Sequence, residues 1–261
     1  IIVVCDEQQG FKITPSQLEK SITSRTKWLM LNSPSNPTGA VYSKQELLAL
    51  SEVLLKHSHV NILTDDIYEK IMYDGNVFFT LASVVPELKN RTLTLNGVSK
   101  AYCMTGWRLG YCGGPKDIIE AMNKIQSQSN TSTSSITMAA SVEALQGTQD
   151  FIKTHNIEFK KRRDMVVEKL NAIDGLTCAT PTGAFYVYPS CAGVIGKKTR
   201  NGDLIDSDAK FMNYLLESEG VAGVHGEAFG LSPYFRLSYA TSKKILEDAC
   251  ARIARACQKL I

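Results

Sequence analysis

The chain has 261 residues, of which 44% are apolar, and its 29 basic and 26 acidic residues give a net charge of +3. This length and composition can support a sizeable core and two domains. The small charge excess predicts no nucleic-acid surface, and the absence of an apolar run of 18 residues predicts no membrane span.

The seven cysteines and four histidines form no metal-binding pattern. The cysteines are odd in number, scattered and without a C-x-x-C pair, so we interpret them as reduced thiols of a cytoplasmic protein. No zinc spacing is present, and we predict no metal site. His225 precedes the segment Gly226-Glu-Ala-Phe-Gly230, and we interpret this histidine as structural.

Strand and helix patterns alternate in the first half of the chain. Apolar runs predict strands near 1–5, 27–32, 60–64, 91–95 and 108–113. Between them, Thr14 followed by Pro15 predicts one helix start, and Ser43 with Glu46 predicts a capping box at another. This rhythm indicates an α/β fold with a mostly parallel sheet. The apolar stripe expected on the second helix consists of Leu47, Leu48, Leu50, Leu54 and Leu55.

The second half changes character after a polar segment at 127–135. A helix is expected from Lys116, with Ile118, Ile119, Met122 and Ile125 at helical spacing, and a long helical stretch at 136–173 is expected to break near Gly147. Beyond it we expect strands near 176–179, 184–188, 221–224 and 234–239, and helices near 207–219 and 242–259. We therefore divide the chain into a large α/β domain, 1–150, and a smaller α+β domain, 151–261.

Lys100 is the first candidate for chemistry. It follows the short strand ending at Asn96-Gly97, and α/β sheets bind ligands beyond the carboxyl ends of their strands. A lysine there can form a Schiff base with an aldehyde cofactor. Arg108, eight residues further on, can hold the phosphate of that cofactor; the arginine and the cofactor would also lower the pKa of the lysine.

A carboxylate, an amide and a second arginine complete the candidates. Asp65 ends an apolar strand and can pair with a protonated ring nitrogen, whereas its neighbour Asp66 is better suited to capping the next helix. Asn36, held in extended geometry by the proline that follows it, can donate to a ring oxygen and to a substrate carboxylate. Arg236, in an alternating strand, can bind a carboxylate with two parallel hydrogen bonds, or can be an ordinary arginine on an edge strand.

Four segments in order resemble the class I aminotransferases, which are pyridoxal-phosphate (PLP) enzymes of fold type I. They are Ser33-Pro-Ser-Asn-Pro-Thr-Gly39, Ile62-Leu-Thr-Asp-Asp-Ile-Tyr-Glu69, the Lys100 segment from Thr92 to Tyr111, and Phe235-Arg-Leu-Ser-Tyr-Ala240. The similarity runs along the whole chain and is greatest to aspartate aminotransferases of the bacterial type.

The resemblance implies transfer of an amino group from an amino acid, with aspartate favoured, to a 2-oxo acid such as 2-oxoglutarate. It implies that PLP is held by Asn36, Asp65, Tyr68, Ser99, Lys100 and Arg108. Tyr68 would donate to the ring oxygen, Ser99 to the phosphate, and Arg236 with Asn36 would bind the substrate. Family members are homodimers with shared active sites, and the segment 127–135 would approach the partner.

Other readings stay open at this point. The same fold serves aromatic and alanine aminotransferases, lyases, and PLP-binding regulatory domains of transcription factors. The chain also opens on Ile1-Ile-Val-Val4, a buried-strand pattern, so we expect a fragment lacking roughly the first third of the family length. Such a fragment would lack the ring-stacking aromatic and part of the phosphate loop, and would bind PLP weakly.

Overall fold

The computed structural model describes residues 1–261, which divide into two compact units. The first unit contains Ile1, Ile13–Ser35 and Val41–Thr154; the second contains Ile2–Lys12, Asn36–Ala40 and His155–Ile261. The sequence-based prediction placed the domain boundary at residue 150. The second unit also takes in two short segments from early in the chain, which the sequence does not reveal.

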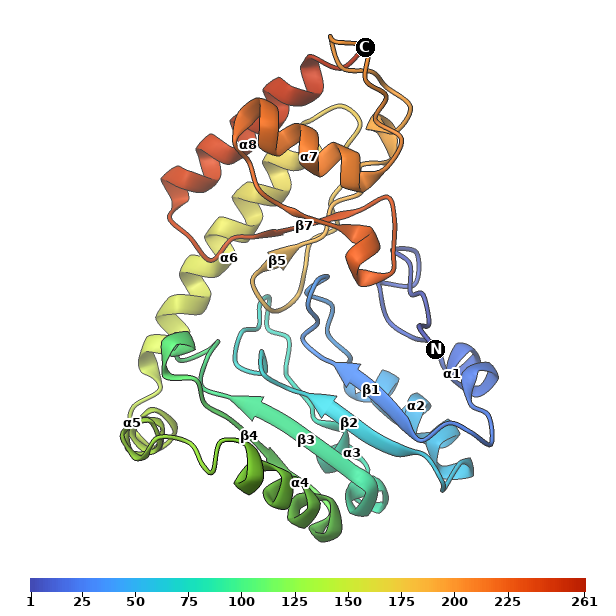
Figure 1. The fold of residues 1–261 in the computed structure, drawn as a ribbon, viewed down its shortest axis with the longest axis vertical. Helices are drawn as coiled ribbons and strands as arrows, with labels where there is room; N and C mark the ends of the chain where they lie inside the picture. Colours follow the sequence, from blue (N-terminus) through green and yellow to red (C-terminus); the bar gives the residue numbers. More distant parts are fainter. The chain divides into compact units, whose positions relative to one another are not determined.

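The first unit is built on a four-stranded sheet in the order β1-β2-β3-β4 (Figure 1). The strands are β1 (Trp28–Asn32), β2 (Asn61–Asp65), β3 (Thr92–Gly97) and β4 (Gly110–Gly113). The first three are parallel and β4 is antiparallel to β3. The α/β class and the mostly parallel sheet are thus confirmed.

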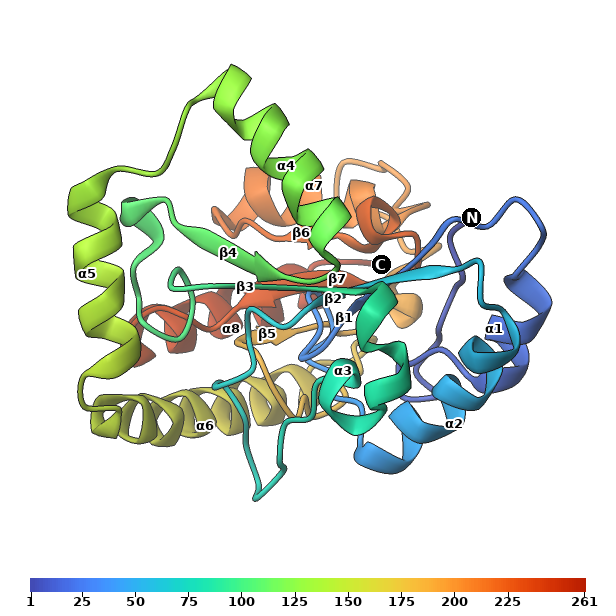
Figure 2. The same ribbon diagram turned by 90° about the horizontal axis from the view of Figure 1, so that it is seen from below.

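Helices cover both faces of this sheet, as Figure 2 shows, with α4 on one face and α1, α2 and α3 on the other. Their bounds are α1 (Pro15–Ser21), α2 (Lys44–Lys56), α3 (Leu81–Val84), α4 (Lys116–Ser129) and α5 (Ser135–Gln146), with 3-10 turns η1 (Pro86–Arg91) and η2 (Thr105–Trp107). The core between the sheet and α1–α3 includes Leu18, Leu50, Leu54, Ile62 and Leu88, each at most 2% exposed.

Local capping chemistry sets where the first two helices begin. Thr14 accepts from the backbone of Gln17 before α1, and Ser43 accepts from the backbone of Glu46 before α2. Both are reciprocal capping boxes, in which the side chain three residues on bonds back to the cap. The predicted starts at Thr14 and Ser43 are confirmed.

Two predictions about apolar residues are wrong. Residues 1–5 form no strand, and Ile1 and Ile2 are 99% and 78% exposed; an apolar run becomes a strand only where another strand pairs with it. On α2, Leu48 and Leu55 are exposed, while Ser51 and Val53 are buried instead. The predicted helix start at Lys116 is confirmed, and no residue of α4 is buried in this chain.

The helix α6 (Asp150–Asn171) follows α5 after the predicted break at Gly147, which ends α5. The polar segment 127–135 is only partly a loop, because α4 continues to Ser129 and α5 begins at Ser135. No helix of the structure is long and apolar enough to cross a bilayer.

The second unit has a small antiparallel sheet in the order β5-β7-β6. Its elements are β5 (Tyr186–Val187), η3 (Ala192–Val194), α7 (Asp208–Glu219), β6 (Val224–His225), η4 (Gly226–Phe229), β7 (Phe235–Ser238) and α8 (Lys243–Gln258). The predicted strand at 176–179 is wrong: Thr177 makes only an isolated bridge with Ser190. The loop lacks the repeated backbone pairing that defines a strand.

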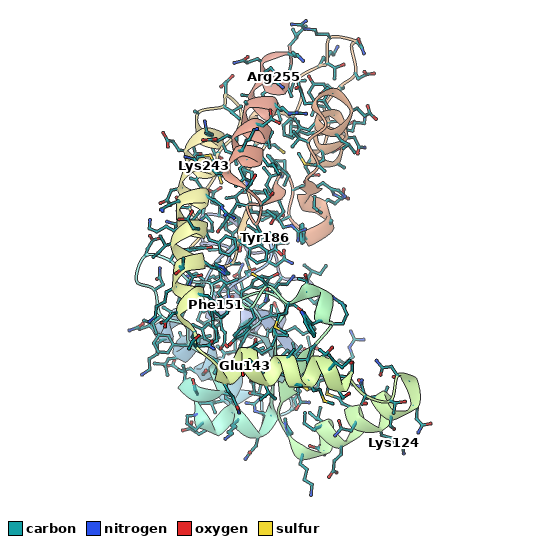
Figure 3. All side chains as sticks on the ribbon, turned by 90° about the vertical axis from the view of Figure 1, so that its left-hand side faces the viewer. Lys124, Glu143, Phe151, Tyr186, Lys243 and Arg255 are labelled. Atoms are coloured by element: carbon teal, nitrogen blue, oxygen red, sulfur yellow. The ribbon has the colours of Figure 1, made fainter.

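Glu219 joins α7 to α8 at the end of each helix. Its carboxylate accepts from Arg255 Nη2 at 2.8 Å and from Lys259 Nζ at 2.7 Å, and its backbone carbonyl accepts from Arg252 Nη1 at 3.0 Å. Figure 3 labels Arg255 on α8. The two cations hold the pKa of Glu219 below its ordinary value, because their hydrogen bonds stabilise the ionised form.

Candidate functional site

Lys100 lies in the loop that connects β3 to β4. The base of this loop is closed by the antiparallel pairing of Gly97 with Gly110. Within the loop, Cys103 donates a backbone hydrogen bond to the carbonyl of Lys100, and Met104 donates to that of Val98. Ser99 and Arg108 lie in the same loop as Lys100, which is half-buried.

Asp65 is brought to this region by sheet register. It is the last residue of β2 and pairs with Leu95 of β3, two residues before the loop begins. Its carboxylate accepts from the backbone of Ile67 at 3.3 Å. Burial raises the pKa of Asp65, while the hydrogen bond from Ile67 and the positive charge of Lys100 oppose that rise, so the carboxylate and the amine are electrostatic neighbours.

Tyr68 completes this group. It is 3% exposed, and the Lys100 Nζ lies 5.8 Å from the centre of its ring. A carboxylate, a phenol and a primary amine therefore meet at the carboxyl ends of β2 and β3. Asp65 also lines a cavity of about 670 Å³ together with Asn96, Gly110 and Tyr111, and it is the only acidic residue there.

Asp66 has a different environment from its neighbour. It is 4% exposed, and burial raises its pKa to about 7. Its backbone amide donates to the carbonyl of Leu95, and its carbonyl accepts from Glu69 in the turn that follows. Asp66 does not line the cavity that contains Asp65, so the two adjacent carboxylates have separate surroundings.

Arg108 sits at the end of η2 with a left-handed backbone, φ 53°. Its Nη1 donates to the carbonyl of Thr105 at 2.9 Å, and its side chain is exposed. Eight residues separate it from Lys100 in the same closed loop. The guanidinium retains donors for an anion such as a phosphate.

Asn36 and Arg236 meet within the second unit. Arg236 Nη1 donates to Asn36 Oδ1 at 2.7 Å. The guanidinium carbon of Arg236 lies 4.8 Å from the ring centre of Tyr186 and 5.1 Å from that of Phe229. These distances are typical of cation–π contacts. Its Nε is buried and has no hydrogen-bond partner.

Arg236 is not an arginine on an edge strand, because β7 is the middle strand of its sheet. Phe235, its neighbour, is fully buried on the opposite side of the strand. The two aromatic residues that pack against the guanidinium were not predicted from the sequence. Phe229 lies seven residues before Arg236 in the segment 226–230, and Tyr186 lies in β5, 50 residues before Arg236.

Gly39 holds the segment of Asn36 in place. Its φ is +68°, and a Cβ at this position would collide with Pro181 and with the carbonyl of Gly183. The carbonyl of Gly39 accepts from the backbone amides of Thr182 and Gly183, at 3.2 and 2.9 Å. Only glycine permits both this conformation and this approach.

A family model for aminotransferase class I and II matches residues 1–253. The chain belongs to this family. It is 56% identical over 260 residues to an aspartate aminotransferase of Rhizobium meliloti strain 1021, a match that covers 100% of the chain and 63% of the relative. It is 54% identical to an aspartate/prephenate aminotransferase of Cereibacter sphaeroides, covering 100% of the chain and 65% of the relative.

Solved aminotransferase structures have the same fold. A crystal structure of the aspartate aminotransferase from Rhizobium meliloti matches with a TM-score of 0.97 at 56% identity, covering 100% of this chain and 65% of that one. The aromatic aminotransferase from Pyrococcus horikoshii matches with a TM-score of 0.86 at 34% identity, covering 97% and 65%. The chain thus spans about 63–65% of the length of these aminotransferases.

Proposed function

We propose that the protein is a PLP-dependent aminotransferase that moves an amino group between aspartate and a 2-oxo acid such as 2-oxoglutarate. The observation that carries this proposal is the grouping of Lys100, Tyr68 and Asp65 at the strand ends. An amine, a phenol and a carboxylate are the groups that an aldehyde-bearing pyridine cofactor requires. The donor set therefore fits PLP.

Each residue has a chemical role in this proposal. Lys100 would hold the cofactor and would accept the proton that leaves the substrate Cα. Asp65 keeps a proton on the ring nitrogen and Tyr68 donates to the ring oxygen. Ser99 and Arg108 bind the phosphate. When bound, PLP supplies an electron sink for the bond that breaks at Cα.

Arg236 and Asn36 are assigned to the carboxylate of the amino acid. The rings of Tyr186 and Phe229 restrict the guanidinium of Arg236, and Asn36 accepts from one of its nitrogens. A pre-ordered guanidinium loses less entropy when it binds a carboxylate. The unpartnered Nε of Arg236 is available as a further donor.

Aromatic amino acids are the second candidate substrates. One solved structure supports this choice by name, the aromatic aminotransferase of Pyrococcus horikoshii. The residues discussed above bind groups that all amino acids share. They therefore do not select between an acidic and an aromatic side chain.

The assembly that we propose is a cytoplasmic homodimer. All seven cysteines are free, as expected of a reducing compartment. Ile125 on α4 and Ile136 on α5 are 71% and 73% exposed, and residues of this kind commonly become buried in an interface. Figure 3 labels Lys124 and Glu143 on these two helices. Sedimentation of the purified protein tests this assembly.

The activity is tested by incubating the protein with PLP, ¹⁵N-labelled aspartate and 2-oxoglutarate. Label appearing in glutamate supports the proposal, and phenylalanine in place of aspartate tests the second candidate. A Lys100→Ala variant serves as the inactive control. Tight PLP binding without transfer from either donor would favour a regulatory role instead.

A further inference from the structure

Three side chains of types that bind metals converge in the second unit, and none of them has a role in the proposed function. They are Asp208 at the start of α7, His225 at the end of β6, and Glu227 in the turn η4. One ligand atom from each lies within 4.8 Å of those of the other two. Asp208 and His225 are 17 residues apart, so no short sequence motif contains all three residues.

Asp208 is buried, but only one of its two carboxylate oxygens accepts hydrogen bonds. It is 1% exposed. Its Oδ2 accepts from the Ser232 hydroxyl at 2.6 Å and from the Glu227 amide at 3.2 Å. Its Oδ1 is buried without any hydrogen-bond partner, and burial of an unpaired oxygen is unfavourable because the hydrogen bonds to water are lost.

His225 also has a buried polar atom that lacks a hydrogen-bond partner. This atom is Nδ1. Asp208 forms no ion pair with a cationic side chain. Burial raises the pKa of the Cys191 thiol to about 12, and the negative charge of Asp208 contributes to this rise. Asp208 and His225 thus each have one unpaired polar atom, and one ligand atom of each residue lies within 4.8 Å of a Glu227 carboxylate oxygen.

Hydrogen bonds and close packing restrain the backbone around these three residues. Gly226 donates to the carbonyl of Tyr234 at 2.7 Å, and the Tyr188 hydroxyl donates to the carbonyls of Gly226 and Leu231 at 3.2 and 2.9 Å. A Cβ on Gly226 would collide with the Leu231 carbonyl. His225 and Glu227, on either side of Gly226, are therefore held in fixed positions relative to α7.

We propose that Asp208 Oδ1, His225 Nδ1 and the Glu227 carboxylate bind a divalent transition-metal cation, with Zn²⁺ as the best fit. One imidazole and two carboxylates leave a fourth position for water, as in zinc sites with three protein ligands. Ca²⁺ and Mg²⁺ prefer oxygen ligands alone. Ligand atoms of tetrahedral zinc are about 3.3 Å apart, so the three ligand atoms, which lie within 4.8 Å of one another, would move closer together on binding.

The test is calorimetric titration of the whole 261-residue chain with Zn²⁺ alone, together with Co²⁺ as a spectroscopic probe. Cys103, the exposed thiol, is replaced by serine in every protein so that its thiolate does not compete. We expect binding at one site and a Co²⁺ spectrum without thiolate bands. Zn²⁺ should also raise the melting temperature, because it binds the folded state.

Two variants decide between a site and a local hydrogen bond. Glu227→Gln and His225→Gln should each weaken Zn²⁺ binding at least tenfold and abolish the thermal shift. The matched controls Glu217→Gln, an exposed glutamate of α7, and His155→Gln should leave both unchanged. Binding equal in all four variants overturns the proposal. So does the absence of Zn²⁺ binding to the unsubstituted chain.

Discussion

Asn36 and Arg236 are 200 positions apart in the sequence and are joined by a 2.7 Å hydrogen bond. Asn36 is the acceptor, so the amide orients one nitrogen of the guanidinium while the rings of Tyr186 and Phe229 restrict its plane. These contacts restrict the guanidinium of Arg236 to one orientation.

Arg236→Lys should weaken binding of the amino acid by tenfold or more while leaving PLP bound. Lysine keeps the charge but loses the planar pair of donors and the stacking on two rings. Titration calorimetry with a 2-oxo acid measures the first effect and cofactor absorbance the second. Arg200→Lys, at an exposed position, is the control. Loss of PLP with unchanged substrate affinity would show that the role is misassigned.

Gly39→Ala should lower the free energy of unfolding by about 2 kcal/mol or more, through a strained φ and a collision with Pro181. Chemical denaturation measures the change. The control is Gly75→Ala, whose φ of +74° is similar but whose added Cβ meets nothing within 4 Å. Gly75→Ala should lower the free energy of unfolding by about 1 kcal/mol, through backbone strain alone. Equal losses at the two positions would argue against tight packing at Gly39.

Lys100 should be the lysine that carries the cofactor. Borohydride reduction of the PLP-treated protein, followed by peptide mass mapping, should place the pyridoxyl mass on the peptide containing Lys100. Lys116 and Lys124, both on α4 and exposed, are internal controls for nonspecific labelling. A label on either of these in preference to Lys100 would refute the assignment.

Asp65→Asn should reduce the rate of transamination by several orders of magnitude, whereas Asp66→Asn should cost little. An amide at position 65 cannot hold a proton on the ring nitrogen as a carboxylate does. Asp66 is directed into different surroundings and lines no part of the same cavity. Single-turnover rates of the two variants test this ranking, and the reverse order would exchange their roles.

The buried Asp66 should make stability fall as pH rises. Burial raises its pKa from 3.8 to about 7, so the folded state keeps a proton that the unfolded state has already released. The resulting stabilisation is complete below pH 3.8 and is lost as pH rises through about 7. Asp66→Asn mimics the protonated acid and should remove roughly 1–3 kcal/mol of this pH dependence.

Denaturation of the wild type and of Asp66→Asn at several pH values between 4 and 8 gives the measurement. Titrations elsewhere contribute equally to both proteins and cancel in the difference. Two parallel curves would mean that Asp66 titrates alike in the folded and unfolded states.

The features predicted well from sequence are those set by nearby residues. Ser43 and Glu46 are three residues apart, so their capping box is visible in the sequence. Leu48 and Leu55 share the apolar character of Leu47, but which of them is buried depends on what the helix meets. Residues 1–5 have strand composition but no pairing strand, and composition does not report pairing.

In the candidate site, too, the residues identified from sequence are those marked by their neighbours in the chain. Asp65 and Lys100 could be proposed because Asp65 ends one strand and Lys100 follows another, and parallel strands end at a common edge of the sheet. The rings that clamp Arg236 and the group formed by Asp208, His225 and Glu227 could not be found. Each group is completed by a residue from a distant element, Tyr186 in the first and Asp208 in the second.

The five residues Asn36–Ala40 belong to the second unit, although the chain on either side of them belongs to the first. The second unit is therefore not one continuous stretch of gene. A recombination event that joined residues 155–261 to another protein would transfer Arg236 but leave behind Asn36 and the Gly39 contact with Pro181. Arg236 therefore keeps its hydrogen bond to Asn36 only if the segment Asn36–Ala40 is inherited with residues 155–261.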